Sequence, residues 1–306
     1  NFWINKRRII KTIVCLIILF KEILKDKNLV IFSFQSNIYC IIFSKIFGIK
    51  IISRSNSAPS GWSNNIFKKF LFRIFLPLAD ETIVNSIQFK KDLDRKFGTK
   101  STCIYNPLNR KQVKSLSKID FHFPFFSKTT LNIISVGRFT DQKDHMTLLS
   151  SIEKIAKKIR LRLLIIGRGI KEKKMINYIN DKNLNKIVRI IPFQKNPFKY
   201  IKKSDLFILT SKFEGLPNVL LEAVTLKKFI ISSDCPTGPK EILQNGKFGF
   251  LFDVGDSISL SKKIKYFYEN KKKLSKKVNM AYSSLDRFDY KKNLNKYLKL
   301  IKKYCD

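Results

Sequence analysis

Histidine is scarce in this chain of 306 residues, and cysteine follows no pattern. Only His122 and His145 are present, which leaves little material for a zinc site or a serine–histidine triad. The five cysteines are scattered and odd in number, without the paired spacing of a metal site or a disulfide framework. We therefore expect no metal site, and the cysteine usage favours a reducing cytosol.

The chain also lacks a hydrophobic run long enough to cross a membrane. Residues 6–20 place an apolar run after a basic cluster, but the run is interrupted by Lys11, and a span needs roughly 20 apolar residues. We interpret this segment as an amphipathic helix that covers a sheet, with interfacial membrane contact as the alternative. Because the chain begins with Asn1 rather than methionine, we expect the start of the natural chain to be missing.

Acidic residues are few. The 61 Lys and Arg against 23 Asp and Glu give a formal net charge of +38, which by itself suggests a polyanionic partner. Lysine is abundant along the whole chain, however, and no nucleic-acid-binding motif is present. We therefore predict no nucleic-acid partner. We predict instead a cytoplasmic protein in peripheral contact with anionic lipid at the inner face of the cell membrane.

Short β-branched runs alternate with helical patterns twice along the chain. The expected strands lie at 29–34, 49–53, 81–85 and 101–105, and then at 131–137, 161–167, 187–192, 205–210, 229–233 and 248–252. This alternation predicts an α/β protein with two doubly wound, Rossmann-like parallel-sheet domains. We place the domains at 1–128 and 129–285, with a linker near 109–130. A C-terminal helix at 286–306 is expected to pack back toward the first domain.

Ligands of such sheets bind at the carboxyl ends of the strands, so the loop after the strand at 131–137 is informative. It holds Gly137, which permits close backbone approach, then Arg138 and Lys143 five residues apart. A guanidinium and an ammonium are suited to neutralise a diphosphate leaving group. The alternative is an ordinary solvated basic loop.

A second loop, after the strand at 205–210, carries two carboxylates around a helix start. Glu214 precedes a helical pattern at 219–228, and Glu222 lies about one turn inside it. The intervening residues are Gly215, Leu216, Pro217 and Asn218. Proline suits a first helical turn, and the backbone amides there can face a phosphate. The alternative for the two glutamates is a solvated helix face, although the apolar neighbours of Glu222 argue against it.

Together these two loops resemble the retaining glycosyltransferases of the GT-B fold, family four, also called glycosyl transferases group one. The resemblance covers nearly the whole chain, is strongest from 131 to 252, and continues through 233–243 in a form typical of enzymes for surface polysaccharides and lipid-linked oligosaccharides. It implies that Arg138 and Lys143 hold the diphosphate, Glu214 meets the donor sugar, Glu222 accepts from the ribose hydroxyls, and Phe193 lies against the nucleobase. The catalytic residues would be Glu214, Arg138 and Lys143. The same likeness places Gly137 and 215–218 in the donor site.

The resemblance also implies the reaction. The donor would be a nucleotide-diphosphate sugar, most closely a UDP-hexose or UDP-N-acetylhexosamine, and the acceptor a glycan or a polyprenyl-linked glycan. Transfer would need neither metal nor other cofactor and would retain the anomeric configuration by front-side attack. The pair Asp92 and Asp94 is similar to a metal-binding motif of the other major glycosyltransferase fold, but its helical setting favours a solvated helix face.

Nothing before residue 29 matches the opening strand and glycine-rich loop of that family. We therefore expect an incomplete N-terminal domain. On the acceptor side we select Arg54 and Asn56 in the polar segment 53–59, with an ordinary turn as the alternative. The competing functions are a nucleotide-sugar epimerase or hydrolase on the same fold and a truncated, inactive membrane-docking homologue. The convergence expected of Arg138, Lys143, Glu214 and Glu222 argues against the last.

Overall fold

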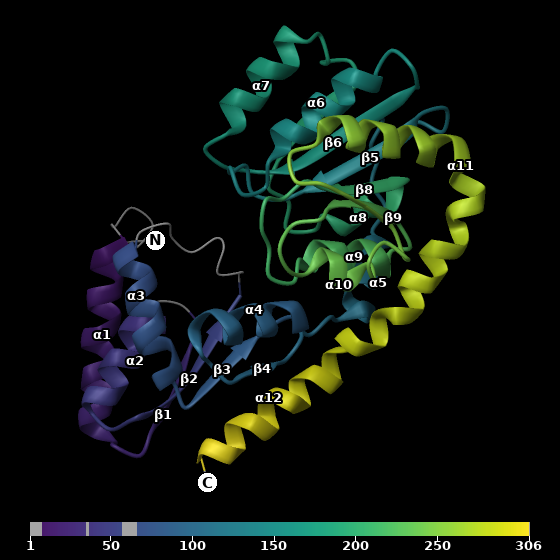
Figure 1. Cartoon of the computed structure of the whole chain (residues 1–306). Coiled ribbons are helices and arrows are strands. Elements are labelled where there is room, and N and C mark those ends of the chain that lie inside the picture. The colour runs from purple at the N-terminus through teal and green to yellow at the C-terminus, as the bar shows by residue number, and fades with distance from the viewer. Residues whose placement is uncertain (1–7, 35–36, 57–65, 306) are drawn as a thin grey trace. The chain divides into compact units, whose positions relative to one another are not determined.

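The computed structural model describes residues 8–34, 37–56 and 66–305 of the chain. Two compact units are formed. Unit 1 comprises Asn1–Tyr105 together with Leu294–Asp306, and unit 2 comprises Asn106–Asn293. Each unit is built around its own parallel sheet (Figure 1).

Unit 1 contains a four-stranded sheet in the order β1-β2-β3-β4, with all neighbours parallel. In the register of this sheet, Ile52 lies opposite Phe32 on one side and Glu81 on the other. The elements in chain order are α1 (Arg8–Lys25), β1 (Val30–Ser33), α2 (Asn37–Ile46), β2 (Lys50–Ser55), α3 (Ile66–Phe75), η2 (Leu76–Leu78), β3 (Glu81–Val84), α4 (Ile87–Phe97) and β4 (Ser101–Cys103).

The two faces of this sheet are covered by different helices. On one face Ile41 of α2, Phe89 of α4 and Ile51 of β2 form a buried cluster, and Ile23 of α1 belongs to it. On the other face the end of α12 (Tyr290–Cys305) packs on the strands. There Tyr297, Leu300, Ile301 and Tyr304 contact a cluster made by Ile52, Ile83 and Ile104. The hydroxyl of Tyr304 also donates to the carbonyl of Asp80 at 2.9 Å.

Unit 2 holds a six-stranded sheet in the order β10-β9-β8-β5-β6-β7, again with all neighbours parallel. Its elements are α5 (Arg110–Ser117), β5 (Leu131–Val136), α6 (His145–Ile155), β6 (Leu161–Gly167), α7 (Glu172–Asp181), β7 (Val188–Pro192), α8 (Phe198–Lys203), β8 (Leu206–Leu209), α9 (Asn218–Thr225), β9 (Phe229–Ser233), α10 (Pro239–Ile242), β10 (Phe250–Phe252), α11 (Ser257–Ser283) and η3 (Ser284–Phe288). Both faces of the sheet are covered, and β8 is buried at every residue, as its continuous apolar sequence predicts.

All ten predicted strands are present, and the predicted α/β architecture of two parallel sheets is confirmed. The boundary between the units, however, follows Tyr105. The segment expected as a linker instead belongs to unit 2, because its aromatic residues pack there. Phe125 is buried, the Phe123 ring meets that of Tyr200 edge-on at 5.1 Å, and Arg162 donates to the carbonyl of Phe125.

The predicted amphipathic helix near the start corresponds to α1, at Arg8–Lys25. Within residues 8–34, 37–56 and 66–305, no helix combines the length and apolarity that a membrane crossing requires. The aspartates of the 92–94 pair lie on α4, as expected. Asp94 accepts from Lys90, Thr99 and the amide of Ser101, and so ties the end of α4 to β4.

Candidate functional site

The strand order of unit 2 reverses between β5 and β8. From β5 the chain proceeds outward to β6 and β7, then returns to the other side of β5 as β8 and continues outward to β9 and β10. In an open parallel sheet, the loops at such a reversal diverge and leave a crevice at the carboxyl ends of the strands. The loop 137–144 follows β5 and the loop 210–217 follows β8, so both predicted motifs begin at this point.

An ion pair joins the two loops. The ammonium of Lys143 lies 2.6 Å from Oε1 of Glu214, and the hydroxyl of Ser211 donates to the same oxygen at 2.6 Å. The Lys143 side chain is 14% exposed and that of Glu214 is 9% exposed. Because both charges are largely removed from water, their attraction is screened little and each depends on the other. The structure therefore brings together two of the three residues predicted to be catalytic.

Backbone contacts hold the loops in register around this pair. The amide of Lys212 donates to the carbonyl of Gln142 at 2.8 Å, and the side-chain amide of Gln142 donates to the carbonyl of Phe213 at 3.0 Å. Thr210 adds a hydrogen bond from its hydroxyl to the carbonyl of Lys143 at 2.9 Å. These bonds fix the loop backbones, so the charged groups are positioned before any ligand arrives.

Arg138, the third predicted catalytic residue, lies on the same loop as Lys143 but is exposed. Its guanidinium is 3.5 Å from Oε1 of Gln142. The backbone of Gly137 lies close against β6, because a Cβ at Gly167 would lie 1.9 Å from the carbonyl oxygen of Gly137. The loop can therefore approach the end of β6 only because position 167 has no side chain. This packing leaves Arg138 directed to solvent, as a residue that meets an incoming phosphate must be.

A third loop, which the sequence analysis did not select, completes the site. Thr237 follows β9 and donates from its hydroxyl to the carbonyls of Glu214 and Gly215 at 2.6 and 3.2 Å. It is buried and has a φ of 63°, which is strained for a β-branched residue. Gly238 has a φ of +75°, and a Cβ there would lie 2.0 Å from the carbonyl oxygen of Gly215. The available sequence signal was the turn Pro236-Thr-Gly-Pro239 directly after a strand.

Helix α9 begins one residue before the predicted position and ends three residues earlier than predicted, at Thr225, with Pro217 preceding Asn218. No side chain caps its first turn, so backbone N–H groups there remain available to an anion. Asn218 is exposed and its Oδ1 accepts from the side-chain amide of Asn106 at 2.7 Å. The same amide group of Asn106 donates to the carbonyl of Leu216 at 3.2 Å. Asn106 thus ties the loop 210–217 to the segment before α5.

Glu222 lies on α9 and is half-buried. It lines a cavity of about 300 Å³ together with Asn109, Gln112, Phe198 and Tyr290, among others. No ion pair or hydrogen bond to its carboxylate is formed by the described residues. Burial without such compensation raises the pKa of Glu222 to about 7. A carboxyl group in this state titrates near neutral pH and has its hydrogen-bonding capacity open to a ligand.

The remaining predicted site residues are exposed or lie in unit 1. Phe193 is 58% exposed after β7, with the guanidinium of Arg168 over its ring at 5.5 Å. Arg54 belongs to β2 and lies over the rings of Phe34 and Tyr297 at 5.6 and 5.5 Å. Asn56 follows β2 and its carbonyl accepts from Asn85 at 3.5 Å. Residues 57–59 of that predicted segment lie outside the described part. The acceptor role of Arg54 and Asn56 stays a prediction.

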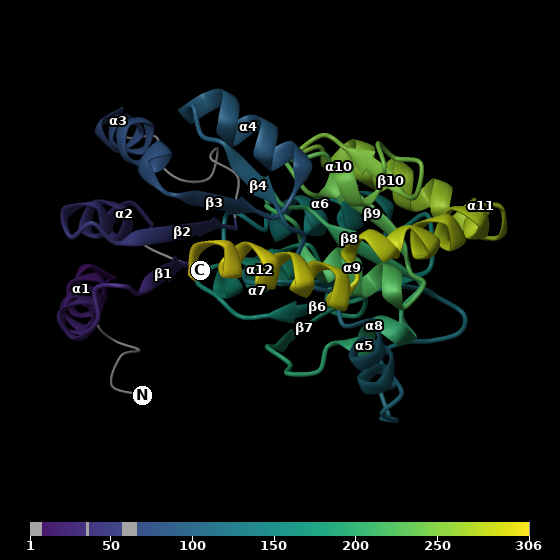
Figure 2. The same ribbon diagram turned by 90° about the horizontal axis from the view of Figure 1, so that it is seen from below.

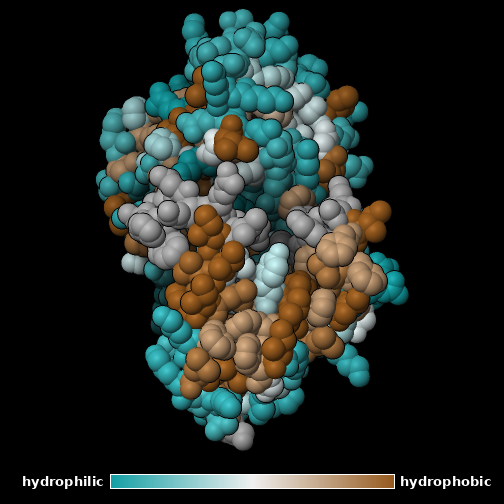
Figure 3. Space-filling model, turned by 90° about the vertical axis from the view of Figure 1, so that its left-hand side faces the viewer, coloured by the Kyte–Doolittle hydropathy of each residue, from teal (hydrophilic) through white to brown (hydrophobic). Residues whose placement is uncertain are grey.

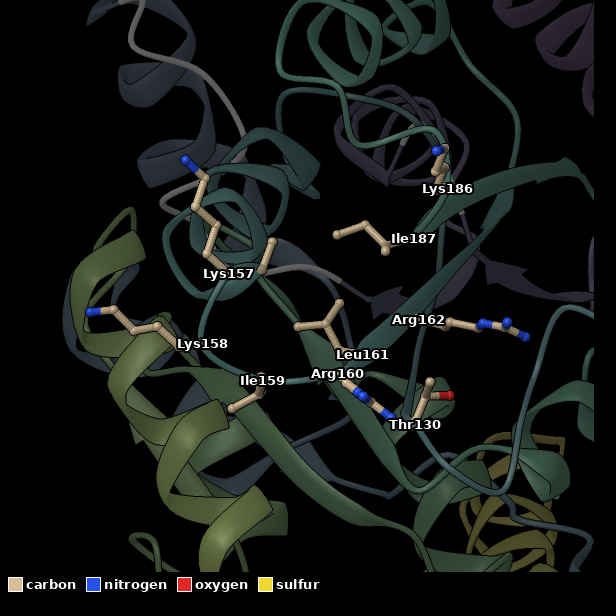
Figure 4. A pocket seen from close by; sticks show the side chains of 10 residues that line it. Thr130, Lys157, Lys158, Ile159, Arg160, Leu161, Arg162, Lys186 and Ile187 are labelled. Carbon is tan, nitrogen blue, oxygen red and sulfur yellow. The ribbon is translucent and has the colours of Figure 1, made fainter.

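Another cavity, of about 390 Å³, lies at the opposite end of the sheet, by the amino ends of β6 and β7. Five of its lining residues are cationic: Lys157, Lys158, Arg160, Arg162 and Lys186. Figure 4 shows that the side chains of Lys157 and Lys158 point away from the apolar floor formed by Leu161 and Ile187. Because these charges diverge, we assign this cavity no ligand.

The scarce histidines take no visible part in the site. His145 begins α6 two residues after Lys143 and is buried. Burial, with a smaller contribution from the Lys143 charge, lowers the pKa of His145 to about 4. Among residues 8–34, 37–56 and 66–305, no three His, Cys, Asp or Glu gather as a metal site would need. Metal-independent transfer stays a prediction.

The three loops of the site lie in a segment that matches a known protein family. Residues 118–284, which contain all three loops, match the family described as "Glycosyl transferases group 1". An uncharacterized glycosyltransferase, MJ1059, of Methanocaldococcus jannaschii is 31% identical over 66% of this chain and 53% of its own length. This chain thus spans about half of that relative.

A second relative covers more of the chain. The N-acetylgalactosamine-N,N'-diacetylbacillosaminyl-diphospho-undecaprenol 4-alpha-N-acetylgalactosaminyltransferase of Campylobacter jejuni is 28% identical over 86% of this chain and 73% of its own length. Among solved structures, Anabaena Alr3699/HepE in complex with UDP superposes with a TM-score of 0.77 at 18% identity, covering 90% of this chain and 78% of that one. The two-sheet fold of unit 1 and unit 2 is therefore that of GT-B glycosyltransferases.

Proposed function

Since the chain belongs to the glycosyl transferases of group 1, we propose that it transfers a hexose or N-acetylhexosamine from a UDP-sugar to a lipid-linked glycan. The observation that carries this proposal is the buried pair of Lys143 and Glu214 at the β5–β8 reversal, with Arg138 exposed beside it. The pair places one cation and one carboxylate at the edge where a parallel sheet binds its ligand.

The two cations suit the charge that develops during transfer. When the bond between the anomeric carbon and the diphosphate breaks, negative charge grows on the departing phosphate. Lys143 and Arg138 lie on one loop, and the uncapped start of α9 adds backbone donors. In this proposal Lys143 turns from Glu214 toward the phosphate as the donor binds. Glu214 is then left to accept hydrogen bonds from the sugar hydroxyls.

Glu222 supplies the second carboxylate of the donor site. Its cavity lies beside the start of α9, and its carboxylate has no competing partner among the described residues. In this proposal it accepts from the ribose hydroxyls, while Phe193 lies against the base. Gly137, Gly215, Leu216, Pro217 and Asn218 supply the backbone around the diphosphate. The complex of UDP with Anabaena Alr3699/HepE supports uracil as the base.

The acceptor is proposed from the names of the relatives. The Campylobacter jejuni relative is named for a diphospho-undecaprenol acceptor, and others are named for amylovoran biosynthesis in Erwinia amylovora and a lipopolysaccharide galactosyltransferase in Escherichia coli. We therefore place the chain in surface-polysaccharide synthesis, peripheral at the inner face of the cell membrane. Arg54 and Asn56 are our candidates for the acceptor side.

Retention without metal completes the proposal. The acceptor hydroxyl attacks the anomeric carbon on the face that the diphosphate leaves, so the new carbon–oxygen bond forms as the old one breaks. An oxygen of the departing phosphate takes the hydroxyl proton. The cations at 138 and 143 then balance the remaining charge of the nucleoside diphosphate, which is the task a metal ion performs in other transferases.

The test is transfer by the full chain. The protein is incubated with each of several radiolabelled UDP-sugars and GDP-mannose, and with membrane lipid containing polyprenyl-diphosphate glycans. Label in the lipid phase that survives removal of the donor supports transfer. Free epimerised or hydrolysed sugar, with no labelled lipid from any donor, contradicts it and favours the epimerase or hydrolase alternative.

A matched pair of variants ties the result to the site. Lys143→Met removes the proposed diphosphate contact and should lower transfer at least 100-fold. Lys171→Met removes another loop lysine of unit 2, one that pairs with Asp141 at 2.9 Å on the surface, and should leave transfer within about twofold. Equal losses in both variants would show that general positive charge, and not the paired lysine, supports the reaction.

A further inference from the structure

Helix α1 exposes a continuous apolar stripe. Isoleucine, phenylalanine and leucine recur at intervals of three and four residues, which places them on one side of the helix. The stripe consists of Ile10, Ile13, Ile17, Phe20 and Leu24, which are between 37% and 65% exposed. The side of α1 that packs into unit 1 is a different one, with Leu19 and Ile23 against the core. Successive turns of α1 therefore expose apolar side chains to solvent.

Helix α3 carries a second stripe of the same kind. Its members are Ile66, Phe67, Phe70 and Ile74, which are between 43% and 84% exposed. Its other side packs inward through residues such as Phe72, whose ring meets that of Phe97 edge-on at 6.2 Å. A ten-residue helix with an inward and an outward apolar side is unusual on a surface that water alone covers.

The two stripes lie on one layer of unit 1. Helices α1, α2 and α3 run side by side over the same face of the sheet (Figure 2), and the Phe20 ring of α1 lies 5.4 Å from that of Phe47 after α2. The middle helix adds the exposed Tyr39 and Ile46. Figure 3 shows the result as hydrophobic residues gathered over unit 1. We call the two stripes with Tyr39, Ile46 and Phe47 the α1–α3 face.

The charges on these helices distinguish between possible occupants. Exposed basic residues lie among the apolar ones: Lys11, Lys21 and Lys25 on α1, Lys45 on α2, and Lys69 and Arg73 on α3. The three helices contain a single acidic residue, Glu22, which pairs with Lys25 at 2.8 Å. Lys45 pairs with Asp80 at 2.9 Å, so Lys11, Lys21, Lys69 and Arg73 contribute most of the positive charge. A second copy of this chain would bring the same positive charges and be repelled. A surface of anionic lipid attracts them, at about 1 kcal/mol for each cation near it.

We propose that the α1–α3 face docks unit 1 on an anionic bilayer. The apolar stripes enter the boundary between headgroups and acyl chains, and the lysines and Arg73 meet the lipid phosphates. None of the described helices is fit to cross a membrane, so the helices lie in the interface plane. The inference deepens the proposed function by naming the surface that would bring the chain to a lipid-linked acceptor, and it rests on that function only for this purpose.

Vesicle flotation tests the surface without any substrate. The full chain is mixed with vesicles of phosphatidylcholine alone or of phosphatidylcholine with about 30% of the anionic lipid phosphatidylglycerol. The partition coefficient is measured at low and high salt. We expect strong binding to the anionic vesicles only, weakened by salt. Because no donor is present, a failed transferase assay leaves this result unaffected, and the converse also holds.

Paired variants separate the apolar from the electrostatic contribution. Phe67→Ser with Phe70→Ser on α3, or Ile13→Ser with Ile17→Ser on α1, should each lower the partition coefficient about tenfold or more. The control Ile170→Ser with Ile258→Ser removes two exposed isoleucines of unit 2 and should change it less than twofold. Lys69→Glu with Arg73→Glu should abolish the preference for anionic vesicles. Lys157→Glu with Lys158→Glu, of equal charge change in unit 2, should not.

Folding and oligomeric state are measured alongside. All these side chains are exposed, so thermal melts within a few degrees of the unmodified chain are expected, and a variant that melts much lower is replaced by the corresponding single substitution. The proposal is overturned if vesicle binding survives both apolar pairs. It is equally overturned if light scattering shows a dimer that the apolar pairs dissociate, because the face would then be occupied by a second copy.

Discussion

The buried ion pair of Lys143 and Glu214 allows a sharp separation of stability from donor binding. In the Lys143→Met variant, the Glu214 carboxylate keeps the Ser211 hydroxyl as a donor but loses its counter-charge. Removing one partner of a buried pair costs about 3–5 kcal/mol. Because the Lys143 side chain is still 14% exposed and Ser211 remains, we expect the lower end, about 3 kcal/mol. For a unit of this size, such a loss lowers the melting temperature by about 6–12 °C.

The double variant with Glu214→Gln distinguishes pairing from packing. A neutral amide needs no counter-charge and can still accept the hydrogen bond from Ser211. The double variant should therefore recover most of the lost stability, to within about 1 kcal/mol of the unmodified chain. In a double-mutant cycle this corresponds to a coupling of about 2 kcal/mol or more. Affinity for UDP should not recover, because the ammonium that would meet the diphosphate is absent from both variants.

Two measurements on the same four proteins decide the matter. Urea unfolding, followed by a signal from unit 2, gives the stability differences, and calorimetric titration with UDP gives the affinities. Additive stability losses, with coupling below about 0.5 kcal/mol, would refute the claim that the pair is mutually dependent. Recovery of UDP affinity in the double variant would refute the assignment of Lys143 to the diphosphate while leaving the ion pair intact as a structural feature.

Three further predictions concern the rest of the donor site. The pKa of Glu222 is raised from 4.5 to about 7, so its contribution to stability is full below about pH 4.5 and is lost as the pH rises through 7. Glu222→Gln should remove this loss of stability and stabilise the chain at pH 8 by up to about 3 kcal/mol. Urea unfolding at pH 5 and 8 measures it, and an equal effect at both pH values would contradict the burial of the charge. Gly238→Ala should lower stability by more than about 3 kcal/mol, because its Cβ would meet the Gly215 carbonyl at 2.0 Å. The control Gly255→Ala, at a φ of +83° with open space around it, should lower stability by only about 1 kcal/mol. Similar melting temperatures for the two variants would disprove the close approach. Phe193→Ala should weaken UDP binding about tenfold by calorimetry with little change in melting temperature, since the ring is 58% exposed, and unchanged affinity would remove Phe193 from the nucleobase site.

The strands of both sheets could be predicted because their burial leaves a direct mark on the sequence. Strand β8, covered on both faces, is buried and apolar at every position. The site at the β5–β8 reversal could be predicted for a related reason. Arg138, Lys143 and Glu214 lie in the loops that follow such strands, and the carboxyl ends of parallel strands meet at one edge. The contact between Lys143 and Glu214 then follows from topology.

Thr237 and Gly238 could not be found in this way. Their roles depend on left-handed backbone conformations and on contacts with the carbonyls of Glu214 and Gly215, more than twenty residues earlier. Periodicity carries no information about such contacts. Likewise Asn106 lies before α5 and donates to Asn218, 112 residues away. One polar residue in an irregular segment gives no pattern from which this bond could be predicted.

Helix α1 shows a different limit. Its sequence is apolar at so many positions that periodicity permits more than one buried side. The prediction that it covers a sheet is met by Ile23, which joins the core of unit 1. The stripe at Ile13 and Ile17 is equally regular but exposed. The packing of Leu19 and Ile23 against the core of unit 1 determines which side is covered, and periodicity does not predict that packing.

The net charge of the surface and the fixed position of Lys143 would affect ligand binding in different ways. With a net charge of +38, the surface attracts any polyanion, and a diphosphate gains no advantage from that attraction. Discrimination must arise where a cation is held in a fixed place. Lys143 is so held, because Glu214 neutralises and positions it within the β5–β8 crevice. In the proposed donor site, the diphosphate of a UDP-sugar meets Lys143 while the sugar hydroxyls donate to Glu214. We therefore expect the chain to bind a UDP-sugar more tightly than UDP alone.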